Sequence, residues 1–174
     1  VATGEYLGVV GSSGSSTGPH LHFEVHDSGT YPGPLLDPYD GVCEALTLAS
    51  LWTEQPAYRQ PTINHASTGF AAPLLPACPT QETPNEQRIF ANGDPIYFRA
   101  WVRDLTPAFP LAFAVHRPNG TLYQSTSYTA TQEYNAAWVS WNNPGFGGGA
   151  AGRWTFEVTL AGITSSRAFW MGAL

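Results

Sequence analysis

Apolar and polar side chains alternate along several short segments in the second half of the chain. Their sequences, in order, are PIYFRAWVRD, LAFAVHRPNGTLYQ, AAWVSW, RWTFEVTL and RAFWMG. In the first of these, the apolar positions are Ile96, Phe98, Ala100 and Val102, each followed by Tyr97, Arg99, Trp101 or Arg103. A period of two places one set of side chains on a core and the other on the opposite face of a β-strand.

The spacing of these segments predicts a β-sandwich. About six short strands follow one another at intervals of roughly ten residues, and no segment has a helical period. Pro118, Asn119 and Gly120 form a hairpin signal between two of the strands, because Asn and Gly tolerate positive φ in a tight turn. We therefore expect an immunoglobulin-like β-sandwich over residues 88–174. Trp101 is the aromatic residue most expected on its exposed surface, as a contact for a sugar or a partner beside Tyr97.

The start of the chain predicts a second, smaller β-unit. Residues 5–10, EYLGVV, are typical of a strand, and a loop rich in Gly and Ser follows them. A second strand is predicted over residues 20–26. Its period of two places His20, His22, Glu24 and His26 on one face, and Leu21, Phe23 and Val25 on a face that should meet a core. The turn-rich segment that follows, DSGTYPGPLLDPYDG, closes this unit near residue 43.

Residues 44–87 lack sustained periodicity and contain many prolines. We interpret them as a long linker that packs on the domains, with Trp52 and Tyr58 as anchors, because a structureless connection of this length is unusual inside one compact domain. EALTLASLW, at its start, is compatible with a short helix or an extended connector. The expected organisation is thus residues 1–43, 44–87 and 88–174, and the expected class is all-β.

Composition excludes several kinds of partner. Only 11% of the 174 residues are charged, the chain contains no Lys, and the net charge is −6. Nucleic acid is therefore excluded as a partner, because binding phosphates requires clustered Arg or Lys. A membrane-spanning helix is not predicted, because the sequence has no run of eighteen apolar residues.

The two cysteines, Cys43 and Cys78, are separated by 35 positions and form no CxxC pair. This spacing excludes a zinc ribbon. A single Cys43–Cys78 disulfide in an exported protein is the simplest interpretation, and two buried free thiols are the alternative.

The histidine row is the candidate chemical site. Side chains two apart along a strand are separated by roughly 6.5 to 7 Å, so His20 and His22 can converge on one small site while His26 lies at its rim. Histidines on a half-exposed strand are the alternative. The pattern alone does not decide between them.

The residues around this pair resemble a known family. LGVVGSSGSSTGPHLHFEV is similar to the end of the catalytic domain in the lysostaphin-type zinc endopeptidases, peptidoglycan-cleaving metallopeptidases with a GxxGxSTGPHLHFE signature. Asp37-Pro38 resembles the point where that domain ends. The resemblance covers about the first forty residues and identifies this part as the C-terminal fragment of an antiparallel, duplicated-hybrid-motif-like β metallopeptidase domain.

The resemblance implies roles for individual residues. His22 stands where the family has a zinc ligand, and His20 where it has a catalytic histidine that assists the attacking water or the developing oxyanion. Ser16, Thr17 and Gly18 belong to the loop that lets the substrate backbone approach. The implied cofactor is one Zn²⁺ ion, the implied substrate is a peptide or peptidoglycan, and the implied location is the bacterial cell envelope, outside the cytoplasm.

Two further zinc ligands, a His and an Asp spaced HxxxD, and another catalytic histidine lie upstream in the family. A catalytic zinc site needs three protein ligands, and His65 and His116 fall in the linker and the sandwich, so this chain by itself is expected to be inactive. Three explanations stay open: a C-terminal part of a longer secreted peptidase, an N-terminal half supplied as a separate chain, or a scaffold that has lost catalysis. The last leads to a rival function, an extracellular assembly or adhesion protein that forms a homo-oligomer or filament through the edges of its sandwich.

Overall fold

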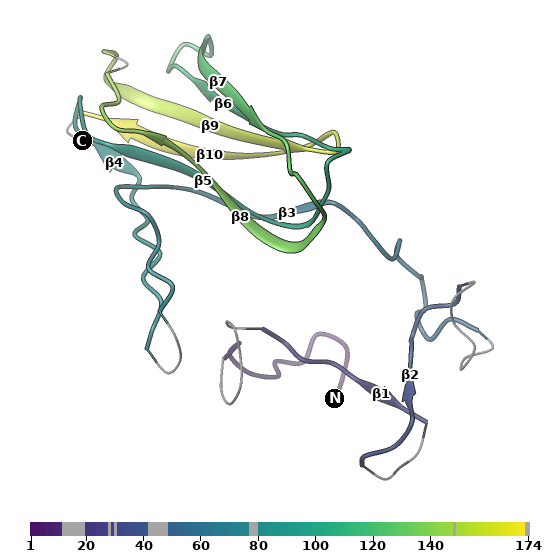
Figure 1. The fold of residues 1–174 in the computed structure, drawn as a ribbon. Helices are drawn as coiled ribbons and strands as arrows, with labels where there is room; N and C mark the ends of the chain where they lie inside the picture. Colours follow the sequence, from purple (N-terminus) through teal and green to yellow (C-terminus); the bar gives the residue numbers. More distant parts are fainter. Residues whose placement is uncertain are drawn as a thin grey trace. The chain divides into compact units, whose positions relative to one another are not determined.

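The computed structural model describes residues 1–11, 20–27, 29, 31–41, 49–76, 80–147 and 149–172. Across these residues the chain is all-β, as predicted, with ten strands and no helix, and therefore no helix able to cross a membrane (Figure 1). The chain divides into two compact units. The smaller unit comprises Val1–Tyr58 and Leu75–Gln81, and the larger one comprises Arg59–Leu74 and Glu82–Leu174.

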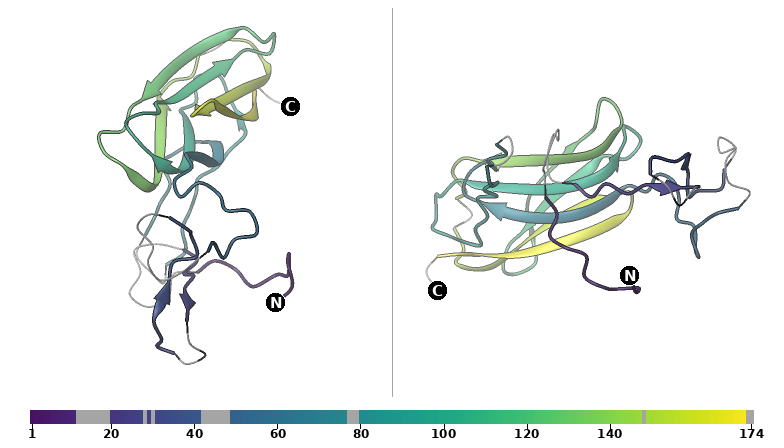
Figure 2. Two further views of the ribbon diagram at one scale, coloured as in Figure 1. Left: turned by 90° about the vertical axis from the view of Figure 1, so that its right-hand side faces the viewer. Right: turned by 90° about the horizontal axis from the view of Figure 1, so that it is seen from below.

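The larger unit consists of two sheets packed face to face (Figures 1 and 2). The three-stranded sheet has the order β3-β5-β8, formed by Thr62–Gly69, Ile96–Leu105 and Tyr134–Asn143. The five-stranded sheet has the order β4-β10-β9-β6-β7, formed by Ile89–Phe90, Ile163–Met171, Gly152–Leu160, Leu111–His116 and Leu122–Tyr128. All neighbouring strands are antiparallel except β4 and β10.

The core lies between these sheets and follows the predicted alternation. The buried apolar side chains of β6 and β9, and those of β5 up to Val102, recur at every second position. They are Ile96, Phe98, Ala100, Val102, Leu111, Phe113, Val115, Trp154, Phe156, Val158 and Leu160. Phe98 on β5 meets Phe156 and Phe169 of the opposite sheet at ring-centroid distances of 5.1 and 5.7 Å. Burial of each such ring contributes about 2 to 3 kcal/mol to stability.

The hairpin predicted at Pro118-Asn119-Gly120 is confirmed. It joins β6 to β7, and Gly120 adopts a φ of 81° that a side chain would disfavour. The backbone N–H of Arg117 donates to the carbonyl of Thr121 at 2.9 Å, and the N–H of Gly120 donates to the carbonyl of Arg117 at 2.9 Å. The Asn119 side chain accepts from the Thr121 N–H at 3.1 Å, which fixes the turn.

Part of the segment expected as a linker is a strand of the sandwich. β3, at Thr62–Gly69, pairs along β5 in the antiparallel direction, so the larger unit begins at Arg59 rather than near residue 88. The buried residues of β3 are Ala66, Ser67, Thr68 and Gly69. Because they are small or polar, they leave no apolar alternation in the sequence, and pairing with β5 determines the strand instead.

After β3 the chain leaves the sheet at Phe70, and the segment that returns to it, residues 80–85, pairs with the outgoing one. The N–H of Phe70 donates to the carbonyl of Asn85 at 3.3 Å, and Leu74 forms an isolated bridge with Thr83. The Arg99 side chain, which is fully buried, donates to the carbonyls of Pro84 and Asn85. A residue predicted on the outer face of β5 is thus covered by this return segment.

Trp101 is not the most exposed tryptophan of this face. Its ring is half-buried, 5.2 Å from the His65 ring and 5.6 Å from the Arg99 guanidinium carbon. Trp138 lies opposite it on β8 and is 41% exposed. The expectation for Trp101 was wrong because the His65 ring of β3 lies against it, a contact between strands that the alternation within one strand does not reveal. Arg99, two positions earlier on β5, occupies the neighbouring position along the same face.

The smaller unit has much less regular structure than predicted. Its strands are β1, Val25–His26, and β2, Leu35–Leu36, which pair with each other. The structure has no strand over residues 5–10 or 20–24, and Leu21 and Phe23 are 76% and 67% exposed instead of packing on a core. Two residue pairs cannot bury a sheet face, and no further strand lies beside these segments within the described residues.

Aromatic contacts organise the end of the smaller unit. The Tyr39 ring packs against Trp52 and Tyr58 with centroids 5.8 and 5.0 Å apart. The Asp40 N–H donates to the Gln55 side chain at 2.8 Å, and the Gln55 amide donates to the carbonyl of Asp40 at 3.0 Å. Trp52 and Tyr58 therefore anchor this segment on the residues that follow Asp37-Pro38.

We predict that Gly69→Ala destabilises the larger unit by about 2 kcal/mol, as overpacking does in a close-packed site. A Cβ at Gly69 would overlap the Arg99 guanidinium and the carbonyl oxygen of Asn85. The free energy of unfolding from urea titrations measures the effect. Gly145→Ala is the matched control, because a Cβ there meets no atom within 4 Å. Equal stability of the two variants would contradict the packing described for Arg99.

Candidate functional site

Three members of the predicted histidine row do lie together. His22, Glu24 and His26 occupy alternate positions, and Glu24 joins the two rings through its two oxygens. Oε1 of Glu24 is 2.6 Å from Nε2 of His22, and Oε2 is 3.0 Å from Nε2 of His26. The shared face predicted from the period of two is therefore confirmed for these residues.

Glu24 is held as a carboxylate by its two neighbours. The hydrogen bond from His22 and, after it, the bond from His26 keep the pKa of Glu24 below its ordinary value. A carboxylate accepts hydrogen bonds at both oxygens, so each bonded Nε2 carries a proton. Glu24 thus fixes which nitrogen of each ring is the donor.

His26 is more firmly held than the rim position predicted for it. Its Nδ1 donates to the carbonyl of Gly33 at 3.0 Å while its Nε2 donates to Glu24, and the Tyr31 ring packs edge-on at 5.5 Å. Both ring nitrogens therefore face acceptors, an arrangement that favours imidazolium. The bond to Gly33 first, and then the bond to Glu24, raise the pKa of His26. The sequence did not indicate the Gly33 contact, because the turn after residue 26 creates it.

His20 lies at the exposed start of this segment, and its backbone N–H donates to the carbonyl of Gly11 at 3.2 Å. This bond joins the residues on either side of 12–19. The expected substrate loop, with Ser16, Thr17 and Gly18, lies outside the described residues. Cys43 and Cys78, the expected disulfide, lie outside them too.

His22 has the properties of a metal ligand. Its side chain is 68% exposed, and because Nε2 donates to Glu24, Nδ1 keeps its lone pair for a metal. A histidine ligand whose other nitrogen donates to a carboxylate is the usual arrangement at zinc sites. The described residues contain no group of three or more His, Cys, Asp or Glu side chains able to hold a metal. Within them, His22 is a single accessible imidazole and not part of a metal-binding group.

The two remaining histidines belong to the larger unit and pair with carboxylates there. His65 is 2.8 Å from Glu86, and His116 is 3.1 Å from Glu157. They come from different sheets of the sandwich, β3 and β6.

We predict that Glu24→Gln lowers the pKa of His26 without returning it to its ordinary value, because the Gly33 bond remains. The ring protons of His26 followed by NMR from pH 4 to 9 measure this, with the exposed Glu54→Gln as control. An unchanged His26 titration in Glu24→Gln would contradict the bridge.

The same contacts give the smaller unit a stability that depends on pH. The contribution of His26, whose folded pKa is raised, is complete below its ordinary value of 6.5 and is lost as pH rises through the folded pKa. The contribution of Glu24, whose folded pKa is lowered, is complete above 4.5 and is lost as pH falls through the folded value. Both contributions to stability are therefore complete between pH 4.5 and pH 6.5, the ordinary pKa values of Glu24 and His26.

Comparison with protein-family models and with curated proteins finds no match for this chain. The chemical interpretation of the site consequently depends on the residues of PHLHFEVH and on their contacts.

Proposed function

We propose that this chain is the C-terminal portion of a secreted zinc metalloendopeptidase of the lysostaphin type, which hydrolyses peptide bonds in bacterial cell-wall peptidoglycan. The observation that carries the proposal is the sequence STGPHLHFE, in which an accessible His22 ring is oriented by Glu24. Within the described residues, His65 and His116 also pair with a carboxylate, but Glu24 alone serves two rings. A zinc ligand benefits from a carboxylate partner, because the carboxylate fixes the tautomer and makes the ring more basic.

The exposed apolar residues of the smaller unit also support the proposal. Leu7, Val9, Leu21 and Phe23 are all largely exposed, although their sequence is typical of strands with one buried face. Covering these side chains with further polypeptide would remove apolar surface from water, which is favourable. The proposed peptidase domain contains such polypeptide, and the additional His and Asp ligands of the family belong to it.

In the proposed site, His22 would hold the metal through its second ring nitrogen, and Glu24 orients the ring. Zinc, when bound, supplies a Lewis acid that lowers the pKa of water and polarises a peptide carbonyl. His20 is the general acid or base of this chain, because its exposed position at the start of the motif allows it to exchange a proton with substrate. His26 keeps Glu24 ionised and in place.

In the complete protein, we expect one zinc per molecule and its loss in His22→Ala. His20→Ala should keep the zinc and lose at least about 100-fold in activity, the usual contribution of a general acid or base. Elemental analysis measures the metal, and the clearing of a peptidoglycan suspension measures activity.

His65→Ala is the control, because this histidine pairs with Glu86 in the larger unit. It should change neither zinc content nor activity. Full zinc content in His22→Ala would overturn the ligand assignment, and full activity in His20→Ala would overturn its catalytic role.

An assembly or adhesion function is the second candidate, and the edges of the sandwich favour it. β7 and β8 each end their sheet in the described part of the chain, and neither contains a charged residue or proline. Natural edge strands are usually protected by charges or prolines against pairing with other chains. These two edges lack that protection.

For this second candidate we expect the chain to form dimers or larger assemblies, and Ala136→Glu on β8 to return it to monomers. Ala136 is exposed on the edge strand, and a charge there disfavours pairing with another copy. Sedimentation equilibrium measures the mass. Ala112→Glu is the control, because Ala112 is also exposed but lies on β6, which has a neighbour on each side. A monomeric unmodified chain would exclude this candidate.

A further inference from the structure

The chain passes from one sheet of the sandwich to the other over residues 86–90. The N–H of Gln87 donates to the carbonyl of Thr68 on β3 at 3.0 Å. The carbonyl of Arg88, the next residue, accepts from the N–H of Trp170 on β10 at 2.7 Å, and β4 follows. This crossing segment therefore joins the free edge of β3 to β10 of the opposite sheet.

A hollow of about 10 Å³ lies beside the crossing segment, between β3 and β10. β3 contributes Ser67 and Thr68 to its lining, the crossing segment contributes Glu86 and Arg88, and β10 contributes Arg167. A volume of about 10 Å³ is the space that one water-sized particle needs. The hollow can therefore hold one water molecule or one monatomic ion, and nothing larger.

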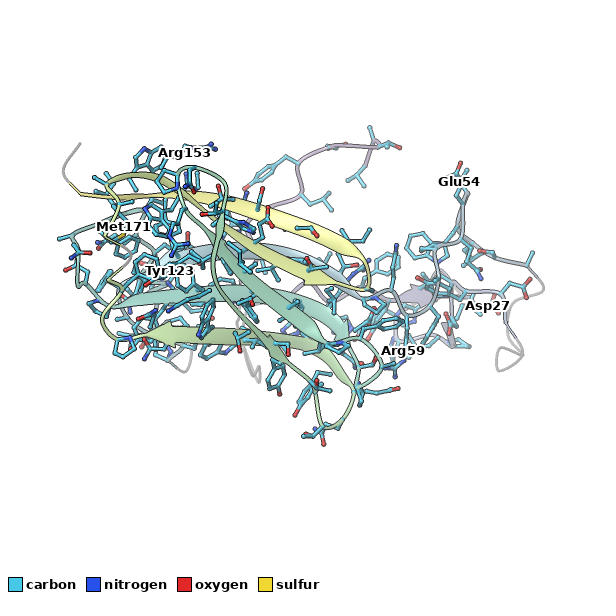
Figure 3. All side chains as sticks on the ribbon, turned by 90° about the horizontal axis from the view of Figure 1, so that it is seen from above. Asp27, Glu54, Arg59, Tyr123, Arg153 and Met171 are labelled. Carbon is cyan, nitrogen blue, oxygen red and sulfur yellow. The ribbon has the colours of Figure 1, made fainter. Side chains whose placement is uncertain are left out.

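Arg167 is fixed at this hollow by a bond between the two sheets. It lies on β10, which ends at Met171 (Figure 3). Its Nε donates to the carbonyl of Ala66 on β3 at 2.8 Å. Within the described residues, the Arg167 side chain has no ion pair and no other hydrogen bond. The N–H groups of its two terminal nitrogens are therefore available to a ligand.

Two further donors of the lining have no partner. The Arg88 side chain has neither an ion pair nor a hydrogen bond in the part of the chain that the structure describes. Ser67 is only 5% exposed, and its buried hydroxyl has no hydrogen-bond partner. A buried hydroxyl without a partner is costly, so a bound species that accepts its proton would stabilise the folded state.

The charge of the lining favours an anion over water. Arg88 and Arg167 are its two cations, and Glu86 is the one carboxylate among the residues that line it. Glu86 already has a partner, because its Oε1 is 2.8 Å from Nε2 of His65. Protonation of His65 would only add positive charge, so the sign does not depend on the state of that ring. An anion between the two guanidinium groups reduces their repulsion.

We infer that this hollow binds one halide ion, such as chloride, through Arg88, Arg167 and Ser67. A halide is monatomic and only slightly larger than water, and it accepts hydrogen bonds from all three side chains. The ion connects β10 and the crossing segment to the edge of β3, where the two sheets separate. The inference does not depend on the proposed peptidase function, because every residue involved belongs to the larger unit.

The test is an NMR titration of the whole chain in which sodium chloride replaces sodium gluconate at constant ionic strength. The expected result is a saturable shift of the backbone amides of Ser67, Arg88 and Arg167, with a millimolar dissociation constant. Bromide should cause the same shifts. Arg88→Gln should weaken chloride binding about tenfold or more, because a hydrogen bond between charged groups is lost. This substitution breaks no bond of the folded chain.

Arg103→Gln is the matched control, because it removes the same charge from an exposed position on β5, away from the hollow. It should leave the dissociation constant for chloride unchanged. Equal weakening by Arg88→Gln and Arg103→Gln would show that only net charge matters and would overturn the site. An absence of saturable shifts at these amides would mean that water occupies the hollow, and would overturn the inference entirely.

Discussion

The contact between Phe98 and the rings of the opposite sheet is the interaction on which the larger unit depends. Phe98 meets Phe156 and Phe169 across the core, and also Trp141 of its own sheet and Phe146 of the loop after β8. Aromatic rings bury large areas and prefer the edge-on and tilted geometries seen here. Because this cluster stabilises the sandwich from within, the outer faces need not supply stability and can carry polar groups. Arg99, under its return segment, lies on such a face.

The smaller unit is held together differently. The buried hydrophobic residues within the described part of the chain all belong to the larger unit. In the smaller one, rings around Tyr39 and hydrogen bonds around Glu24 and His26 hold short stretches of chain in place. Local polar contacts of this kind fix side-chain orientation but contribute little to global stability. The candidate chemistry therefore lies in the unit that has no buried hydrophobic residue within the described part of the chain.

Sequence alone predicted those features that a single strand determines. The alternation in β5 and β9 gave their buried faces, and the Asn119-Gly120 pair gave the hairpin. The strand β3 was missed because its buried residues are small or polar, and the register with β5 that defines it is a long-range property. The alternation of residues in the sequence predicted that His22 and Glu24 share a face. The bond from His26 to Gly33 could not be predicted, because it forms only when the turn between these residues closes.

Pairing with a glutamate does not by itself distinguish a functional histidine in this protein. His65 and His116 each pair with one carboxylate, Glu86 or Glu157, and a chain with so few charges satisfies its imidazoles in this way. The group at Glu24 differs because one carboxylate serves two rings, and the bond to Gly33 commits His26 to a structural role. The other ring, His22, is left accessible with one nitrogen fixed as a donor and the other open. In this group, His26 positions the carboxylate of Glu24, and His22 remains available, as a metal ligand must. The pairs His65–Glu86 and His116–Glu157 in the sandwich contain only one ring each.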